Sequence, residues 1–394
     1  MNDEAFRSEV RRFIKDNLPA EIARRTLRGY HPHKPDVLHW TAALERRGWS
    51  VPNWPEAYGG PGWSVAQRHI FDEEAFLAGC PALSPQGVYL VGPIIYTYGD
   101  ASQKDRFLPG IRSGRHFWAQ GFSEPNAGSD LANLQTRAVR HGDHYLVNGQ
   151  KIWTSEAHYS EWLFLLARTS TDGRPQAGIS FLLIDLTSPG VTVRPIRSID
   201  GGHILNEVFL EDVQAPVENL IGEENKGWTY AKELLGAERT FSAEAARCKG
   251  MLARLRGIAA AMPARGRPLI EDPHFARRVG QLEIEVLAHE ATLWRAVAEE
   301  EAEVVSAAPT SSILKVRGTE LVQRIGALTV EALGDEGLRA YPERDYLLSG
   351  PYESAGHPLA PGVAADFFYR RSATIYGGAN EIQRNIIAAQ LLRG

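Results

Sequence analysis

The sequence predicts an α+β protein of several domains: a helical domain over residues 1–115, a β-rich domain over 116–225 and a helical bundle over 226–394. Two observations predict this order. In both outer zones, apolar residues recur at steps of three and four, which is the period of an amphipathic helix. In the middle zone, short apolar runs are bounded by glycine, proline and polar residues, which is typical of strands in a compact barrel or sandwich.

The N-terminal zone opens on an amphipathic helical pattern. No apolar core follows its basic residues, so the pattern does not predict a signal peptide. Helical spacing continues over residues 36–49 and 64–79, while the Pro/Gly-rich stretch 51–63 predicts a loop. The run Gly59 to Gly62 in that loop lacks a preceding strand and the Lys-Ser/Thr ending of a phosphate-binding loop. It therefore predicts a turn between helices.

The middle zone contains two turn signals. Gly142-Asp143 lies between alternating segments and predicts a hairpin, and Asn148-Gly149 predicts another hairpin turn. The apolar runs at residues 161–169, 178–186 and 190–196 predict strands.

The C-terminal zone returns to helical patterns at about 226–260, 272–304, 309–334 and 363–391. Within the first of these, a buried stripe is predicted along residues 228–258. Glu238 falls on that stripe, seven residues from both Ala231 and Ala245. Apolar neighbours raise the pKa of a carboxyl group, which suits Glu238 to accept a proton from carbon. The alternative is a structural partner for an arginine, since Arg239 is adjacent.

Composition excludes several classes of function. The net charge is −5, so no attraction to nucleic acid or to an anionic membrane is expected. Only Cys80 and Cys248 are present, which excludes a disulfide framework and a cysteine-rich metal site and favours the cytoplasm. No apolar stretch is long enough to span a bilayer. The histidines lack metal-binding spacing, and no Gly-x-Ser-x-Gly nucleophile motif occurs, so we expect no metal.

One turn, from Ser123 to Asp130, joins hydroxyl groups, backbone amides and small residues in "SEPNAGSD". Such a turn can donate hydrogen bonds to an anion or to the edge of a polar ring. Taken alone, an ordinary capped turn is as good an interpretation. The stretch "VNGQKIWTS" at residues 147–155 follows after a hairpin, and together the two segments resemble the acyl-CoA dehydrogenase family. The resemblance extends over the whole chain, from "VPNWPEAYGGPGWS" at residue 51 to "IYGGANEIQRNIIAAQLL" at residue 375.

The resemblance implies the fold of that family: an N-terminal helical domain, a central β-domain and a C-terminal four-helix bundle. It also implies FAD bound between the last two, and dimers or tetramers. By position in the motifs, Ser129 would touch both substrate and cofactor. The side chains expected along the flavin ring are Gln120, Phe122 and Ser123 on one side and Trp153, Thr154 and Ser155 on the other. The residues expected to reach the FAD of a neighbouring subunit are Glu331, Asp335, Ala379, Asn380 and Glu381.

The chain departs from the family pattern at the tail. Gly377 stands where many members carry the glutamate that removes the α-proton, although its backbone N–H can still hold the thioester oxygen beside Gly378. Glu238 in "GAERT" aligns with the alternative base position of isovaleryl-CoA and long-chain acyl-CoA dehydrogenases, with Arg239 on the substrate side. Asp335 replaces a small residue, and Ala379 replaces a usual threonine.

These features predict dehydrogenation of an acyl-CoA, with electrons passed to an electron-transfer flavoprotein. The motifs are most similar to those of large subunits of bacterial pimeloyl-CoA dehydrogenases. The volume left by Gly377 favours bulky, branched or ω-carboxylated acyl chains. Two alternatives stay open. One is a non-catalytic FAD-binding subunit paired with a related small subunit, and the other is a flavin oxidase or monooxygenase on the same fold.

Overall fold

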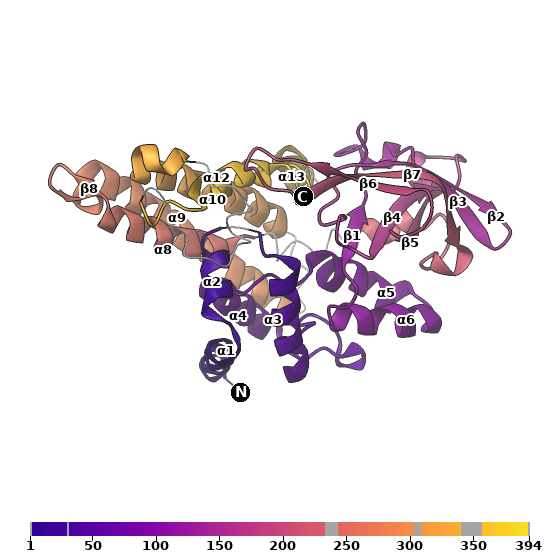
Figure 1. Cartoon of the computed structure of the whole chain (residues 1–394), viewed down its shortest axis with the longest axis horizontal. Coiled ribbons are helices and arrows are strands. Elements are labelled where there is room, and N and C mark those ends of the chain that lie inside the picture. Colours follow the sequence, from indigo (N-terminus) through magenta and orange to yellow (C-terminus); the bar gives the residue numbers. More distant parts are fainter. Residues whose placement is uncertain (1, 30, 233–242, 303–308, 340–356, 393–394) are drawn as a thin grey trace.

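The computed structural model describes residues 2–29, 31–232, 243–302, 309–339 and 357–392. A sheet lies at one end of the molecule and a helical bundle at the other, and the N-terminal helices pack below them (Figure 1). The predicted order of helices, sheet and helices is confirmed. No helix within the described ranges combines the length and apolar character that a membrane span requires.

The N-terminal helices confirm the helical patterns of that zone. α1 buries Phe6, Val10 and Ile14, which recur at steps of four. α4 begins at a capping box formed by Ser64 and Gln67, so its start is encoded locally. The helices are α1 Asp3–Asn17, α2 Ala20–Leu27, α3 Lys34–Arg47, α4 Val65–Ala78, the π-helix η2 Gln86–Val91, α5 Gly92–Tyr98 and α6 Ala101–Arg112.

The central domain is a seven-stranded sheet with strand order β1-β4-β2-β3-β7-β6, and β5 pairs with β4. β1 runs parallel to β4, whereas β2 and β3 form the antiparallel hairpin predicted at Gly142-Asp143. The three predicted apolar runs are strands. The strands are β1 Trp118–Gly121, β2 Arg137–His141, β3 His144–Lys151, β4 Trp162–Arg168, β5 Ile179–Asp185, β6 Val191–Ile196 and β7 Leu205–Pro216.

The hairpin predicted at Asn148-Gly149 is wrong, because both residues lie inside β3 at a bulge against β7. The Asn148 side chain exchanges hydrogen bonds of 2.9 Å with the carboxylate and the backbone N–H of Asp212. A Cβ on Gly149 would lie 2.4 Å from Thr136 Oγ1. The glycine is therefore explained by a close approach between strands and not by a turn.

The C-terminal helices bury a separate apolar core, to which α8 contributes Cys248, Leu252 and Leu255. Two predicted continuous helices are interrupted. Glu244 has a φ of 57°, in the left-handed region, and α8 begins only at the next residue. The last pattern breaks before α13. The helices are α8 Ala245–Ala261, α9 Pro273–Glu301, α10 Thr310–Leu333, α12 Val363–Tyr369, the 3₁₀-helix η8 Arg370–Thr374 and α13 Asn380–Leu391.

Candidate active site

A buried ion pair joins the two motifs of the β-domain. Lys151, at the end of β3, is fully buried, and its Nζ donates to Glu124 Oε1 at 2.8 Å and to the carbonyl of Phe122 at 3.1 Å. Next to it, the N–H of Ile152 donates to the carbonyl of Ser123 at 3.0 Å. The segments 122–124 and 151–152 are therefore fixed side by side.

Glu124 also organises the turn that follows β1. Its carboxylate accepts hydrogen bonds from the backbone N–H groups of Gln135 at 2.6 Å and Thr136 at 2.9 Å. Burial raises the pKa of Glu124, but the charge of Lys151 and these hydrogen bonds outweigh it and hold the pKa below its usual value. Burial lowers the pKa of Lys151 to about 8, against the pull of Glu124. The pKa is lowered at both residues for different reasons. The fully buried Lys151 loses its hydration, whereas the charged form of Glu124 keeps two amide donors as well as the lysine.

The segment after β3 has an unusual backbone. Trp153 and Glu156 adopt left-handed φ values of 60° and 63°, and 57% of the Trp153 surface is exposed. Non-glycine residues in this region concentrate at functional sites. Between them, Thr154 is buried and clamped to β7, since its N–H donates to the Asn206 carbonyl at 2.9 Å and its own carbonyl accepts from Asn206 Nδ2 at 3.0 Å.

These residues fit a flavin. The Thr154 Oγ1 atom is buried and has no hydrogen-bond partner in the described part of the chain, which leaves a polar atom available to a ring edge. Trp153 presents an exposed aromatic surface beside it. Of the other predicted contacts, Gln120 lies in β1 and Phe122 is buried against Phe164 and Phe181, whereas Ser129 is exposed and Ser155 is partly buried. The structure joins the segments 122–124 and 151–152, so residues 153–155 follow directly after this junction.

The tail residues form an exposed loop between η8 and α13. Gly377 and Gly378 have φ values of 63° and 81°, which L-residues rarely adopt. A Cβ placed on Gly377 would meet nothing within 4 Å, whereas one on Gly378 would lie 2.6 Å from Gln383 Nε2. Within the described parts of the chain, the volume beside Gly377 is therefore open in the direction that a Cβ atom would take.

The residues predicted to reach a neighbouring FAD differ in exposure. Glu331 is exposed and pairs with Arg278, with 2.7 Å between Glu331 Oε2 and Arg278 Nη2. Asp335 and Glu381 are exposed, and Ala379 immediately precedes α13. Asn380 is only 2% exposed, and its side chain is bonded within its own chain. The Asn380 side chain is therefore engaged within its own chain, and the predicted contact with a neighbouring cofactor would have to use its backbone.

Glu238 and Arg239 lie outside the described residues. Ala245 is the first residue of α8, and Glu244 before it has a left-handed φ of 57°. The assignment of Glu238 thus rests on its motif alone.

Sequence reasoning missed Lys151 and Glu124, which hold the site together. The sequence did contain a sign of this pair: the first motif carries an acidic residue, Glu124, and the second carries a basic residue, Lys151. Lys151 also ends a strand in which Tyr145 and Val147 are buried. A lysine in a buried alternating position is rare unless it is paired.

Comparisons with known proteins identify the family. The family descriptions that match are "Acyl-CoA dehydrogenase, N-terminal domain" over residues 2–115, "middle domain" over 119–213 and "C-terminal domain" over 225–392. Acyl-CoA dehydrogenase IpdE1 of Mycobacterium tuberculosis is 34% identical over 99% of this chain and 97% of that protein. Acyl-CoA dehydrogenase FadE29 of the same organism is 34% identical over 98% of this chain and 96% of that protein.

Two solved structures extend the likeness. The "Tcur3481-Tcur3483 steroid ACAD" has a TM-score of 0.85 at 28% identity and covers 100% of this chain and 98% of its own. The ChsE4-ChsE5 complex from Mycobacterium tuberculosis has a TM-score of 0.81 at 30% identity and covers 99% and 97%. The chain belongs to the acyl-CoA dehydrogenase family. It is an oxidoreductase that uses FAD to dehydrogenate acyl-CoA thioesters.

Proposed function

We propose that this chain removes the α-proton of a bulky acyl-CoA with Glu238 and passes the electrons to an electron-transfer flavoprotein. The observation that carries the proposal is the open space beside Gly377. No side chain of the described residues fills it, and the backbone N–H of Gly377 is retained. The chain therefore keeps a donor for the thioester oxygen while it lacks a carboxylate at that position, and the base has to come from another residue.

The roles of the residues follow from the chemistry. The α C–H of a thioester is a weak acid, and a hydrogen-bond donor at the developing oxyanion is worth about 3 kcal/mol. Gly377 N–H supplies that donor, and Glu238 accepts the proton. FAD, when bound, would supply the acceptor for the hydride of the β-carbon. Trp153, Thr154 and Ser155 would hold one side of the flavin ring, Gln120, Phe122 and Ser123 would hold the other, and Ser129 would lie at the mouth.

The acyl group is proposed to be larger than butyryl. Space beside Gly377 lies next to the reacting carbons in this assignment. The sequence resembles enzymes for ω-carboxylated chains, and one similar structure carries "steroid" in its title. An ω-carboxylated chain and a steroid side chain both extend further past the β-carbon than butyryl does, and this length is the property that they share. A panel of butyryl-CoA, octanoyl-CoA, pimeloyl-CoA and a steroid side-chain CoA thioester separates these cases.

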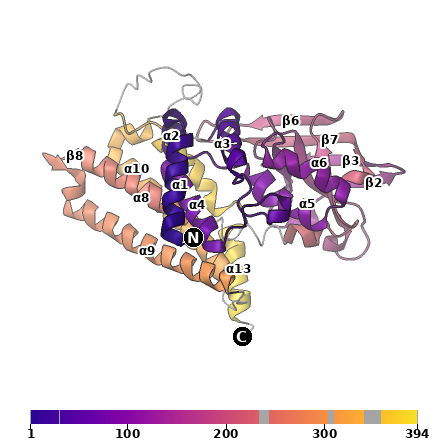
Figure 2. The same cartoon turned by 90° about the horizontal axis from the view of Figure 1, so that it is seen from below.

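Assembly to at least a dimer, with a second copy or with a related subunit, is also proposed. Asn380 is the buried residue of α13, whereas Ile382, Leu391 and Leu392 are exposed. The last turns of α13 extend away from the bundle (Figure 2). An exposed apolar helix of this kind needs a partner surface. Sedimentation of the FAD-loaded protein tests this point, and a monomer would contradict it.

A non-catalytic subunit is the second candidate, and Gly377 favours it because the usual base is absent. One similar structure is described as a ChsE4-ChsE5 complex, and the other is named for two proteins, Tcur3481 and Tcur3483. Anaerobic titration of the purified, FAD-loaded chain with the panel separates the candidates. Bleaching of the flavin by at least one acyl-CoA supports catalysis by this chain. A protein that stays yellow with every thioester is the non-catalytic subunit.

A further inference from the structure

The tail loop has few contacts of its own. Residues 375–378 are exposed, and a Cβ on Gly377 would have no atom of the described residues within 4 Å. A hydrogen-bond donor is useful in catalysis only when it is held within about 0.5 Å of its productive position. The position of the Gly377 N–H must therefore be set by the residues on either side of the loop.

One face of α10 contacts the residues on both sides of the tail loop. Four polar residues of α10 follow one another at steps of three, four and four residues, so they share a face. They are Ser312, Lys315, Thr319 and Gln323. The first three are buried, which is unusual for a row of polar side chains on one helix.

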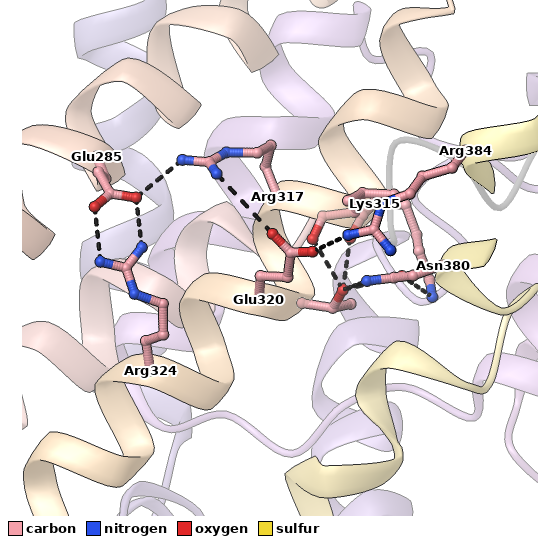
Figure 3. Close-up of polar contacts among 9 residues, drawn as sticks. Glu285, Lys315, Arg317, Glu320, Arg324, Asn380 and Arg384 are labelled. Carbon is pink, nitrogen blue, oxygen red and sulfur yellow. Dashed lines mark hydrogen bonds and ion pairs between the residues drawn. The ribbon is translucent and has the colours of Figure 1, made fainter. Parts of the chain in front are cut away.

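Lys315 and Thr319 hold the start of α13. Lys315 is 3% exposed, and its Nζ donates to Asn380 Oδ1 at 2.8 Å. The Asn380 Nδ2 atom donates to Thr319 Oγ1 at 3.2 Å, and Thr319 Oγ1 also donates to the carbonyl of Lys315 at 2.9 Å. Figure 3 shows Lys315 and Asn380 facing each other between α10 and α13. These bonds fix the residue three positions after Gly377.

The remaining residues of the face hold the two flanks. Ser312 Oγ donates to Gln383 Oε1 at 2.8 Å, and Gln383 Nε2 makes a longer contact of 3.5 Å with the carbonyl of Gly377. On the other side, Gln323 Nε2 donates to the carbonyls of Arg370 and Arg371, both at 3.1 Å. Arg371 returns a bond of 3.0 Å to the Gln323 carbonyl. Hydrogen bonds from α10 therefore hold the chain on both sides of the 375–378 loop.

We propose that this polar face of α10 positions the Gly377 N–H for the thioester oxygen and that Lys315 is its central positioning residue. The inference rests on the function proposed for Gly377. Loss of the Lys315 donor leaves Asn380 Oδ1 without its strongest partner and frees the start of α13. The donor at Gly377 then moves away from its optimum, so the bound acyl-CoA becomes a weaker carbon acid, while the flavin contacts in the β-domain are unchanged.

The test compares Lys315→Met with Arg324→Met. Methionine has a similar length to lysine but cannot donate. Arg324 lies on another part of α10, where it binds Glu285 on α9 with distances of 2.6 and 2.8 Å (Figure 3). The substitution at Arg324 therefore removes a contact of α10 without touching the tail. Ser312→Ala is a milder second variant that weakens only the Gln383 anchor.

Two readouts are measured on FAD-loaded protein. The first is the rate of flavin bleaching at saturating acyl-CoA. We expect a fall of roughly 10–100-fold in Lys315→Met, since one oxyanion donor is worth 10²–10³-fold, a smaller fall in Ser312→Ala, and no more than a few-fold change in Arg324→Met. The second uses a 3-thiaacyl-CoA of the best chain length, which can lose its α-proton but has no β-hydride. Its pKa on the enzyme, read from visible absorbance, should rise by about one or more in Lys315→Met.

Each outcome decides one point. If no acyl-CoA bleaches the wild-type flavin, the proposed function falls and this inference falls with it. If the wild type bleaches and Lys315→Met has the same rate and the same ligand pKa, only the inference is overturned. If Lys315→Met does not fold, the ligand pKa in Ser312→Ala decides, and a value equal to that of the wild type overturns the inference.

Discussion

Lys151 and Glu124 lie 27 positions apart in the chain and form a buried ion pair of 2.8 Å that connects the segments 122–124 and 151–152. The Glu124 carboxylate also accepts hydrogen bonds from the backbone N–H groups of Gln135 and Thr136. It therefore fixes the position of the backbone there as well as the side chain of Lys151. Phe122 is packed against Phe164 and Phe181, whereas the relative position of the segments 122–124 and 151–152 is set by the ion pair and by the hydrogen bond from Ile152 to Ser123. The pair therefore joins two separate segments that we propose to face the flavin.

Lys151→Met should destabilise the fold and weaken FAD binding. The substitution leaves a buried carboxylate without its counter-charge, which costs about 3–5 kcal/mol. Urea unfolding and the FAD content of the purified protein measure both effects. The double variant Lys151→Met/Glu124→Gln should recover part of the stability. Arg256→Met, which breaks an exposed ion pair with Glu283, serves as the control and should cost at most about 1 kcal/mol. An equal loss in both single variants would contradict the role given to Lys151.

Gly377→Ala should change substrate preference without loss of FAD. The added methyl group enters the open space beside the reacting carbons, so kcat/KM should fall at least about tenfold more for the bulkiest accepted acyl-CoA than for butyryl-CoA. The left-handed backbone costs roughly 1–2 kcal/mol for alanine. Gly142→Ala is the matched control, because Gly142 has the same φ of 63° and nothing within 4 Å, but lies in the β2–β3 turn. Parallel losses on both substrates would show that the space does not hold the acyl chain.

Asp72 should make stability depend on pH. Burial raises the pKa of Asp72 to about 7, although a hydrogen bond from Tyr89 and the charge of Arg68 oppose the rise. Between pH 4 and 7 the folded state keeps a proton that the unfolded state has lost, so this group's contribution falls as pH rises. Relative to Asp72→Asn, the wild type should lose on the order of 2 kcal/mol of unfolding free energy between pH 5.5 and pH 8. Urea curves that stay a constant distance apart would rule this out.

The zones of this fold could be predicted because periodicity is a local property. The spacing of apolar residues gives α1, α3 and α4, and alternation gives the hairpin at Gly142-Asp143. The hairpin prediction at Asn148-Gly149 was wrong, because Gly149 is required by its close approach to Thr136. A local sequence pattern contains no information about that contact. The break before α13 was missed since residues on both sides keep helical spacing, while Gly377 and Gly378 reverse the backbone.

The site residues divide in the same way. The motifs at 120–130 and 151–155 could be found from the sequence, because each is a contiguous segment. The Lys151–Glu124 pair and the polar face of α10 join residues that are far apart in sequence, so only the folded chain reveals them. Asn380 is an example: its motif suggested a cofactor contact, whereas its side chain is bound to Lys315 and Thr319 of its own chain.

The central claim is that Glu238 is the base, and Glu238→Gln tests it most directly. Glutamine keeps the size of the side chain but cannot accept a proton. Anaerobic rapid mixing of the FAD-loaded variant with the best acyl-CoA measures flavin bleaching, and Glu244→Gln, which alters a carboxylate bound to Arg247 at the start of α8, is the control. We predict a rate loss of roughly 10²–10⁴-fold or more in Glu238→Gln, with FAD content and binding of the enoyl-CoA product unchanged and Glu244→Gln within a few-fold of the wild type. Bleaching of Glu238→Gln within a few-fold of the wild-type rate would contradict the claim and place the base on another residue.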